Sequence, residues 1–312
     1  MEKFDLIVLG SGPGGYVTAI RASQLGLKTA IIEKENLGGV CLNWGCIPTK
    51  ALLKSAQVFD YLKNAESYGL SIEKADKNFK SVIERSRNVA KTMSKGVTFL
   101  MKKNKISVFN GFGKLGKDNT IHITDSNNNE TIIHSEKIII STGARSKELP
   151  NVVQDGEKVI GYREAMNLKN QPKKMTIIGS GAIGIEFAFF YNSMGTEVTV
   201  IEYLDRIIPN EDEDISKELE KILSKKGIKI IKSSSVKKTE IKDNGVEISV
   251  ENSNGENLTF NSEIVLSAVG VKTNIENIGL EDIGIEVKND KIVVDDFYRT
   301  NVCLLYTSPS PR

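Results

Sequence analysis

The chain has 312 residues, 39% of them apolar and 26% charged, which suits a globular protein of two domains at about 150 residues each. Its formal net charge of +2 gives no reason to expect nucleic acid or an anionic membrane as a partner. No apolar run reaches the ~18 residues of a membrane span, and the N-terminus does not fit a signal peptide, so we expect a cytoplasmic protein.

The first predicted element is a strand over residues 4–9 that leads into a glycine-rich turn and a helix. A second strand, over residues 29–32, is followed by the acid Glu33. In such a turn the first glycine permits the sharp bend, the second lets the backbone approach a pyrophosphate, and the third allows close helix–strand packing. The helix N-terminus attracts phosphate, and the acid accepts hydrogen bonds from ribose hydroxyls. The turn residues are Gly10, Gly12, Pro13, Gly14 and Gly15.

Two cysteines follow this turn, Cys41 and Cys46, with four residues between them. Apolar spacing over residues 46–64 predicts a helix that Cys46 opens, and a helix N-terminus stabilises the thiolate that performs disulfide exchange. A zinc site would need about four ligands, and only Cys303, His122 and His134 are left to complete it. Two unpaired buried cysteines are a second alternative. A redox-active disulfide beside a flavin is favoured because the pair follows an FAD-type turn.

Two further segments have a structural interpretation. Seven apolar residues between 79 and 100 fall on one face of a predicted helix, which indicates a core face. They are Phe79, Val82, Ile83, Val89, Met93, Val97 and Leu100. His122 and His134 lie in alternating, strand-like segments, and we expect them in a β-ribbon without a catalytic role.

The glycine turn then recurs. A strand over residues 175–178 leads into a second turn, and a strand over residues 198–201 is followed by Glu202. Each landmark of this copy lies 169 residues after its counterpart in the first copy. Two copies in register, each between a strand and a helix, predict that the protein binds two dinucleotides. The second turn comprises Gly179, Gly181, Ala182, Ile183 and Gly184.

Glu202 indicates which nucleotide the second copy binds. A carboxylate at this position repels a 2′-phosphate, so NAD is favoured over NADP. Arg206 lies four residues further on and weakens the argument, but Glu202 follows the strand directly.

Residues 38–50, GGVCLNWGCIPTK, closely resemble the active-site signature of the pyridine nucleotide-disulfide oxidoreductases. The resemblance runs from residue 4 to about 302, and it is nearest to members that oxidise dihydrolipoamide with NAD. It includes residues 141–144 (STGA), 111–113 (GFG) and 268–270 (AVG). Relatives that reduce glutathione disulfide carry basic residues in place of Glu202, and mercuric reductases need a further cysteine pair, so these are the weaker alternatives.

The resemblance implies an α/β fold of two Rossmann-like, three-layer ββα dinucleotide-binding domains, with the NAD domain inserted in the FAD domain. We expect the FAD domain over residues 1–148, the NAD domain over 149–275, and the start of the return to the FAD domain over 276–302. It also implies a homodimer in the full-length parent. The expected partner is a lipoyl-bearing acyltransferase of a 2-oxoacid dehydrogenase complex, or a glycine-cleavage carrier protein.

Site residues follow from the matching positions. Cys41 would attack the disulfide substrate, Cys46 would face the flavin, and Lys50 would lie near the flavin in a partly buried pair with Glu186. Electrons would pass from Cys46 to FAD and then as hydride to NAD. The expected FAD residues are Gly10, Gly12, Pro13, Gly14, Gly15, Glu33, Lys50, Gly113, Thr142 and Gly143. The expected NAD residues are Gly179, Gly181, Ala182, Ile183, Gly184, Glu202, Val236 and Gly270. No metal site is expected.

The chain departs from the family near its end. The match stops at Val302, and neither the family's Gly-Asp pair nor its dimerisation domain with a catalytic His follows. We therefore expect a C-terminally truncated chain with a non-native tail over residues 303–312, weak flavin retention and little or no lipoamide activity. The alternative is a catalytically inert nucleotide-binding fragment, which would be colourless when purified. Val271 stands where the family commonly has Arg, and nothing in the sequence explains that change.

Overall fold

The structure, a computed structural model, describes residues 1–307. Its internal contacts divide the chain into two compact units. Unit 1 comprises Met1–Cys46, Val89–Arg145 and the chain from Lys272 on, and unit 2 comprises Ile47–Asn88 and Ser146–Val271. Residues 47–88 thus group with unit 2, although they lie between two segments of unit 1 in the sequence. The domain limits expected at residues 148 and 275 stay predictions.

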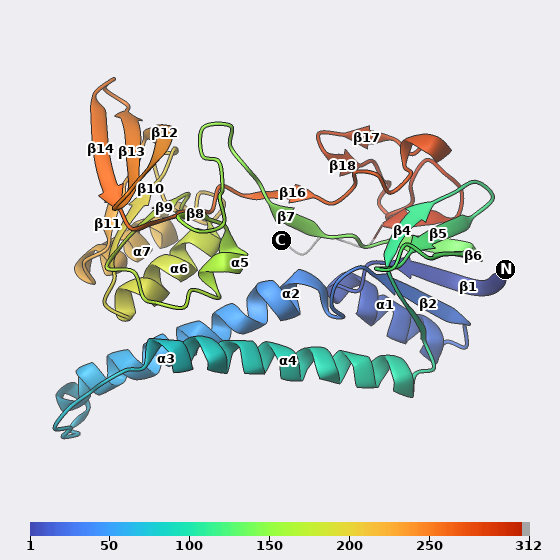
Figure 1. The fold of residues 1–312 in the computed structure, drawn as a ribbon, viewed down its shortest axis with the longest axis horizontal. Coiled ribbons are helices and arrows are strands. Elements are labelled where there is room, and N and C mark those ends of the chain that lie inside the picture. The colour runs from blue at the N-terminus through green and yellow to red at the C-terminus, as the bar shows by residue number, and fades with distance from the viewer. Residues whose placement is uncertain (308–312) are drawn as a thin grey trace. The chain divides into compact units, whose positions relative to one another are not determined.

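Unit 1 is built on a seven-stranded sheet in which β3, β2, β1 and β6 run parallel to one another (Figure 1). The apolar run of β1 is buried, as expected for a parallel strand with both faces covered. Its core contains Ile7, Ile32 and Ile138 from three neighbouring strands. The strands are β1 (Glu2–Leu9), β2 (Thr29–Glu33), β3 (Ser107–Asn110), β4 (Phe112–Leu115), β5 (Thr120–Thr124), β6 (Glu130–Ile140) and β19 (Leu305–Thr307).

Strands β4, β5 and β6 form an antiparallel ribbon at one end of this sheet. His122 pairs with Lys114 and His134 pairs with Thr120, so the predicted ribbon is confirmed. Part of the tail expected to be non-native also joins the sheet, because β19 pairs with β6 and Leu305 is buried. Residues 308–312 of that tail lie outside the described residues.

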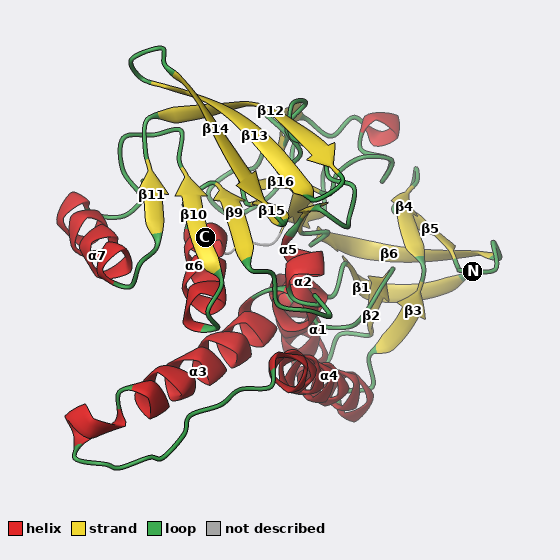
Figure 2. Cartoon of the chain, turned by 60° about the vertical axis from the view of Figure 1, so that its left-hand side comes forward, coloured by secondary structure: helices red, strands yellow, loops and turns green. Residues whose placement is uncertain are grey.

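Unit 2 has three layers. A parallel sheet in the order β11-β10-β9-β15-β8 lies between helices and the antiparallel sheet β12-β13-β14 (Figure 2). Val250 of the antiparallel sheet shares one core with Ile178 and Val265 of the parallel sheet. The strands are β8 (Val159–Ile160), β9 (Lys174–Ile178), β10 (Glu197–Ile201), β11 (Lys229–Ile231), β12 (Ser234–Lys242), β13 (Gly245–Asn252), β14 (Asn257–Ser262) and β15 (Ile264–Ser267). The α/β fold class predicted from the sequence is confirmed.

Two long helices follow the cysteines, and each begins where the apolar spacing predicts. Arg85 and Ser86 of α4 donate to the carbonyls of Ala51 and Pro48 in α3, at 2.8 Å and 3.1 Å. The predicted apolar face of α4 holds except at Met93, whose side chain is exposed. The longer helices are α1 (Pro13–Gln24), α3 (Cys46–Lys63), α4 (Phe79–Lys103), α6 (Ala182–Ser193) and α7 (Glu213–Lys225).

The remaining elements are short. They are α2 (Gly39–Trp44), α5 (Tyr162–Ala165), the 3-10 turns η1 (Ala65–Tyr68) and η2 (Glu281–Ile283), and the strands β7 (Ala144–Ser146), β16 (Val271–Thr273), β17 (Val287–Lys288) and β18 (Lys291–Ile292). Within residues 1–307 no helix is both long enough and apolar enough to cross a membrane.

Candidate redox and dinucleotide sites

The first glycine turn joins β1 to α1 in unit 1. Gly10 has a φ of 99°, and a Cβ added to it would lie 2.2 Å from the carbonyl oxygen of Ser141. A Cβ on Gly15 would lie 1.9 Å from the carbonyl oxygen of Gly10. A Cβ on Gly12 would meet nothing within 4 Å, and Pro13 begins the helix. The outer two glycines are therefore required by the fold, while the backbone at Gly12 is open to a ligand.

The second glycine turn joins β9 to α6 in unit 2 and repeats this geometry. Gly179 has a φ of 98°, and a Cβ on it would lie 2.5 Å from the carbonyl oxygen of Ala268. A Cβ on Gly184 would lie 2.0 Å from the carbonyl oxygen of Gly179, and one on Gly181 would meet nothing within 4 Å. The helix starts at Ala182. The repeat seen in the sequence is thus a repeat of close backbone contacts.

A buried carboxylate braces each turn. Glu33 accepts hydrogen bonds from the backbone N–H of Ser11 at 3.0 Å and from its hydroxyl at 2.6 Å. Glu202 accepts from the N–H of Ser180 at 2.8 Å and from its hydroxyl at 2.6 Å. Sequence reasoning missed both serines. The signal was present, because each serine stands between the first two glycines of its turn.

The loop that carries the cysteines starts on the first turn. The N–H of Gly38 donates to the carbonyl oxygen of Ser11 at 3.1 Å and to its hydroxyl at 3.2 Å. A Cβ on Gly39 would lie 2.6 Å from the Cα of Gly12. Cys41 is therefore two residues from a backbone segment that packs directly against the first glycine turn.

The cysteines themselves are held on two consecutive helices. Cys41 lies in α2 and is partly exposed, whereas Cys46 is the first residue of α3 and is exposed. Asn43 fixes the loop by donating to the carbonyls of Leu37 and Gly39, at 3.1 Å and 2.9 Å.

Tyr16 of α1 lies close enough to Cys41 for the charge of the thiolate to affect the pKa of the phenol. Burial raises the pKa of the Tyr16 hydroxyl, and the negative charge of a Cys41 thiolate raises it further. The phenol therefore stays protonated at neutral pH.

Lys50 and Glu186 meet within unit 2, where the Nζ of Lys50 forms an ion pair with the Oε1 of Glu186. The structure thus brings together the two residues that the resemblance pairs. The Lys50 side chain is 63% exposed and that of Glu186 is 28% exposed, so the pair is more open than expected. A groove of about 450 Å³ beside them is lined by apolar side chains that include Leu53, Phe189 and Leu223.

Two other expected cofactor positions have open backbone. Gly143 follows β6 and Gly270 follows β15, and a Cβ on either would meet nothing within 4 Å. Their φ values of 69° and 106° favour glycine. Together with Gly12 and Gly181, they leave each unit with two exposed stretches of backbone beside a helix N-terminus. This arrangement fits the pyrophosphate of a dinucleotide.

Gly113 and Val236 have simpler explanations. A Cβ on Gly113 would lie 2.5 Å from the Cδ1 of Leu9, so packing by itself accounts for glycine there, and its expected role in binding FAD stays a prediction. The side chain of Val236 is buried in the unit 2 core, and its carbonyl accepts a hydrogen bond from Asn151. Of the expected NAD residues, Val236 has the least support from the geometry.

Residues 4–307 match the family model described as pyridine nucleotide-disulphide oxidoreductase. The dihydrolipoyl dehydrogenase of Zymomonas mobilis is 45% identical over 301 residues, covering 96% of this chain and 65% of that protein. The chain spans about two thirds of the length of this relative and of the dihydrolipoyl dehydrogenases of Rhizobium etli and Bacillus subtilis, which are 45% and 41% identical to it.

Solved structures give the same family of folds. The flavoprotein disulfide reductase RclA of Escherichia coli, solved as a Cu(II) complex, has a TM-score of 0.84 and 26% identity, covering 98% of this chain and 66% of that chain. LpdA of Mycobacterium tuberculosis has a TM-score of 0.89 at 24% identity, covering 98% of this chain and 67% of that chain, and shows likeness of fold.

Proposed function

This chain belongs to the pyridine nucleotide-disulfide oxidoreductase family, and we propose that it is the FAD- and NAD-binding part of a dihydrolipoyl dehydrogenase. The resemblance seen in the sequence is confirmed at the family level. In the proposed reaction a protein-bound dihydrolipoyl group and NAD⁺ give the lipoyl group and NADH. The proposal depends mainly on one observation. Gly38 and Gly39, just before Cys41 in the sequence, pack directly against a glycine turn of the dinucleotide-binding type.

FAD is proposed for unit 1 and NAD for unit 2. In unit 1 the open backbone at Gly12 and Gly143 would hold the pyrophosphate, and Glu33 would face the ribose. In unit 2 Gly181, Gly270 and Glu202 would do the same for NAD. FAD, when bound, supplies the two-electron chemistry that links thiols to NAD. Buried Glu202 favours NAD over NADP, because a 2′-phosphate would meet a carboxylate.

The thiols would react by disulfide exchange. A lipoyl thiolate attacks the Sγ of Cys41 in the oxidised pair, which forms a mixed disulfide and breaks the Cys41–Cys46 bond. Cys46 leaves as a thiolate. The second lipoyl thiol, once deprotonated, then attacks the lipoyl sulfur of the mixed disulfide and releases Cys41. Two electrons have moved from the lipoyl dithiol to the cysteine pair, and the lipoyl disulfide is closed.

Helix α3 supports these roles for the cysteines. Cys46 is the first residue of an 18-residue helix, so its sulfur lies where unpaired backbone N–H groups favour an anion. Cys46 is therefore suited to be the thiolate that leaves. Lys50 follows one turn later and would add positive charge near the flavin, with Glu186 fixing its ammonium group.

The proposed partners are a lipoyl-bearing acyltransferase of a 2-oxoacid dehydrogenase complex or a glycine-cleavage carrier protein. Homodimer formation by the full-length protein and a cytoplasmic location likewise stay predictions.

The proposal is tested with the purified chain and with a version extended to the relatives' full length. We expect the chain to bind FAD and to show bleaching of the bound flavin by NADH. We expect the extended version to oxidise dihydrolipoamide with NAD⁺, and not to reduce glutathione disulfide. A chain that takes up no FAD when titrated, or an extended version that prefers glutathione, would contradict the proposal.

A further inference from the structure

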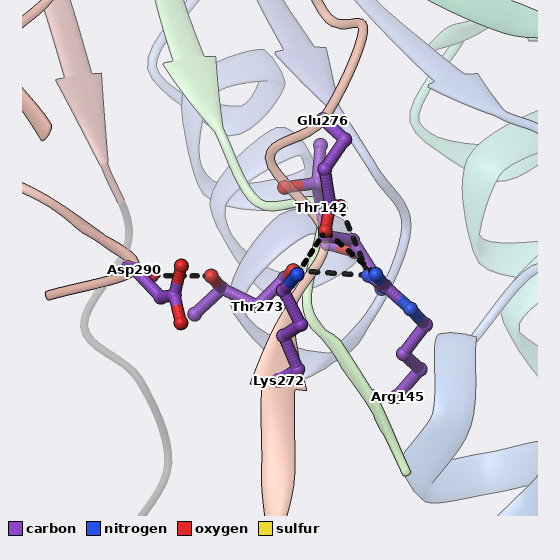
Figure 3. Close-up of polar contacts among 7 residues, drawn as sticks. Thr142, Arg145, Lys272, Thr273, Glu276 and Asp290 are labelled. Carbon is purple, nitrogen blue, oxygen red and sulfur yellow. Dashed lines mark hydrogen bonds and ion pairs between the residues drawn. The ribbon is translucent and has the colours of Figure 1, made fainter. Parts of the chain in front are cut away.

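A cluster of polar side chains in unit 1 lies at the two places where the chain passes between the units. Arg145 is the last unit 1 residue before the inserted segment, and Lys272 is the first one after it. Arg145 and Lys272 both reach Glu276 (Figure 3). The cluster therefore joins two chain segments that are more than 120 residues apart in the sequence.

Arg145 makes most of the contacts. Its two terminal nitrogens donate to both carboxylate oxygens of Glu276, at 2.6 Å and 3.0 Å. It also donates to the carbonyl oxygen of Thr273 at 3.1 Å and to the Oδ1 of Asn274 at 2.9 Å. A planar guanidinium can satisfy several acceptors in fixed directions at once, which a lysine ammonium does less well.

Asn274 connects Arg145 to the backbone that follows β6. Its side-chain Nδ2 donates to the carbonyl oxygen of Thr142 at 2.9 Å, and its backbone N–H donates to that of Gly143 at 2.9 Å. Because its Oδ1 faces Arg145, the amide can present only its NH2 group to Thr142. Arg145 therefore fixes the orientation of the amide that holds Thr142.

Thr142 and Gly143 lie beside the first glycine turn. A Cβ on Gly10 would lie 3.1 Å from the Cα of Thr142. With both carbonyls bonded to Asn274, the backbone N–H groups of these two residues have no hydrogen-bond partner within residues 1–307. Two N–H donors that have no partner among the described residues, close to the first glycine turn, form a surface that a phosphate can use.

The equivalent position in unit 2 is Gly270, and among the described residues its carbonyl is not held by a side chain like that of Asn274. There the carbonyl oxygen of Gly270 accepts a hydrogen bond from the backbone N–H of Lys147 at 3.0 Å. Unit 1 thus has an additional device, defined by Arg145, Asn274 and Glu276, which we name the clasp.

We propose that Arg145 and Asn274 are positioning residues for the flavin nucleotide, because they hold the Thr142–Gly143 backbone so that its N–H groups face the ligand. The inference rests on the proposed binding of FAD by unit 1. Its effect is geometric more than energetic, since the Arg145 and Glu276 side chains are 45% and 40% exposed and such ion pairs add little stability. The hydrogen bond from Arg145, aided by Lys272, lowers the pKa of Glu276, so the clasp stays charged at neutral pH.

The test uses the whole chain stripped of flavin, with FAD and NADH dissociation constants measured by fluorescence titration. Asn274→Asp is the decisive variant, since aspartate still accepts from Arg145 but cannot donate to Thr142. We expect Asn274→Asp and Arg145→Ala each to raise the FAD Kd about tenfold, or about 1.4 kcal/mol. The NADH Kd should stay within about twofold. Lys272→Ala is the matched control, because it removes a charge from Glu276 without touching Asn274, and its FAD Kd should change less than about twofold.

Two measurements distinguish a positioning role of Arg145 and Asn274 from a purely structural one. They are the melting temperature and the hydrogen exchange of residues 140–146. In Asn274→Asp the melting temperature should fall by no more than about 4 °C, the effect of losing one hydrogen bond, because the contact to Arg145 is retained, while exchange in this segment becomes faster. An unchanged FAD Kd, or a loss of FAD and NADH affinity in equal measure, would overturn the inference. If the unsubstituted chain binds no FAD, the proposed function fails instead. In that case hydrogen exchange alone tests whether the clasp holds the Thr142–Gly143 backbone. Unchanged exchange of residues 140–146 in Arg145→Ala would refute this role.

Discussion

In unit 1 Glu33 accepts hydrogen bonds from the amide and the hydroxyl of Ser11, and in unit 2 Glu202 accepts the same two bonds from Ser180. The two acids are equally buried, at 8% and 7% exposed. The two turns therefore have the same pattern of hydrogen bonds, in which a buried acid holds the serine of the turn. We call this pattern the frame of each unit. What differs is the segment that follows the acid.

In unit 1 the segment returns to Ser11 through Gly38, whose φ is 97°, and leads directly to Cys41. In unit 2 the carbonyl of Ser180 accepts instead from the N–H of Ile208 at 3.0 Å. Ile208 has a φ of 38°, a strained conformation for a β-branched residue, and the loop directly after it contains no cysteine. Under the proposed function, the frame serves nucleotide binding in both units, and only in unit 1 does the loop bonded to it carry the redox cysteines.

The third glycine of each turn should give the largest effect. Gly15→Ala and Gly184→Ala would each force a Cβ to within about 2 Å of a backbone carbonyl that cannot move freely. We expect each to cost about 3 kcal/mol or more of stability and to abolish the dinucleotide site of its own unit only. Flavin retention and NADH titration measure the two sites separately.

The matched control for these variants is Gly96 in α4, where a Cβ would meet nothing within 4 Å. Gly96→Ala should stabilise the protein by roughly 0.5–1 kcal/mol. If Gly15→Ala and Gly184→Ala each weakened both sites to the same degree, the two frames would not be independent.

The buried acids come next. Glu202→Ala leaves the N–H and hydroxyl of Ser180 without their acceptor, which costs about 1 to 3 kcal/mol for a buried group. We expect a weaker NADH Kd and a smaller preference for NADH over NADPH, both measured by fluorescence titration. Glu33→Ala should weaken FAD and spare NADH. An unaltered NADH/NADPH ratio in Glu202→Ala would show that another residue selects the nucleotide.

The serines should have a smaller effect, because the backbone N–H remains bonded to the acid in each variant. Ser180→Ala should weaken NADH by about 1 kcal/mol, the net value of one hydrogen bond. Ser11→Ala should weaken FAD similarly and, in addition, speed alkylation of Cys41, since the hydroxyl also accepts from Gly38. Equal alkylation rates in the two variants would remove the distinction drawn between the loops.

The smallest effect on stability is expected at the Lys50–Glu186 pair. Because the Lys50 side chain is 63% exposed, Lys50→Ala should change the free energy of unfolding by less than about 1 kcal/mol in urea titration. A larger loss would mean that the pair holds α3 to α6 rather than serving the reaction.

The sequence predicted the parts of this fold that depend on short-range pattern. Gly10, Gly15 and their counterparts could be found because a turn, a helix start and an acid recur at one offset. The helix opened by Cys46 followed from its apolar spacing. These features are local, so a window of some thirty residues contains their cause.

The parts that were missed depend on contacts between distant segments. Arg145 and Glu276 are 131 residues apart, and no pattern near either residue indicates the other. The bracing serines were visible as a repeat, but their bond to the acid is a property of the folded turn. The position of the Val236 side chain in the core likewise follows from the packing of unit 2, and the assignment of this residue to NAD stays a prediction.

The central claim is that the thiols fastened to the unit 1 frame carry the electrons of the reaction, and Cys46→Ser in a full-length version tests it most directly. Oxidation of dihydrolipoamide by NAD⁺ should collapse, because no disulfide can form, while oxidation of NADH by a dye acceptor persists through the intact nucleotide sites. Dihydrolipoamide turnover equal to that of the unsubstituted enzyme would contradict the account.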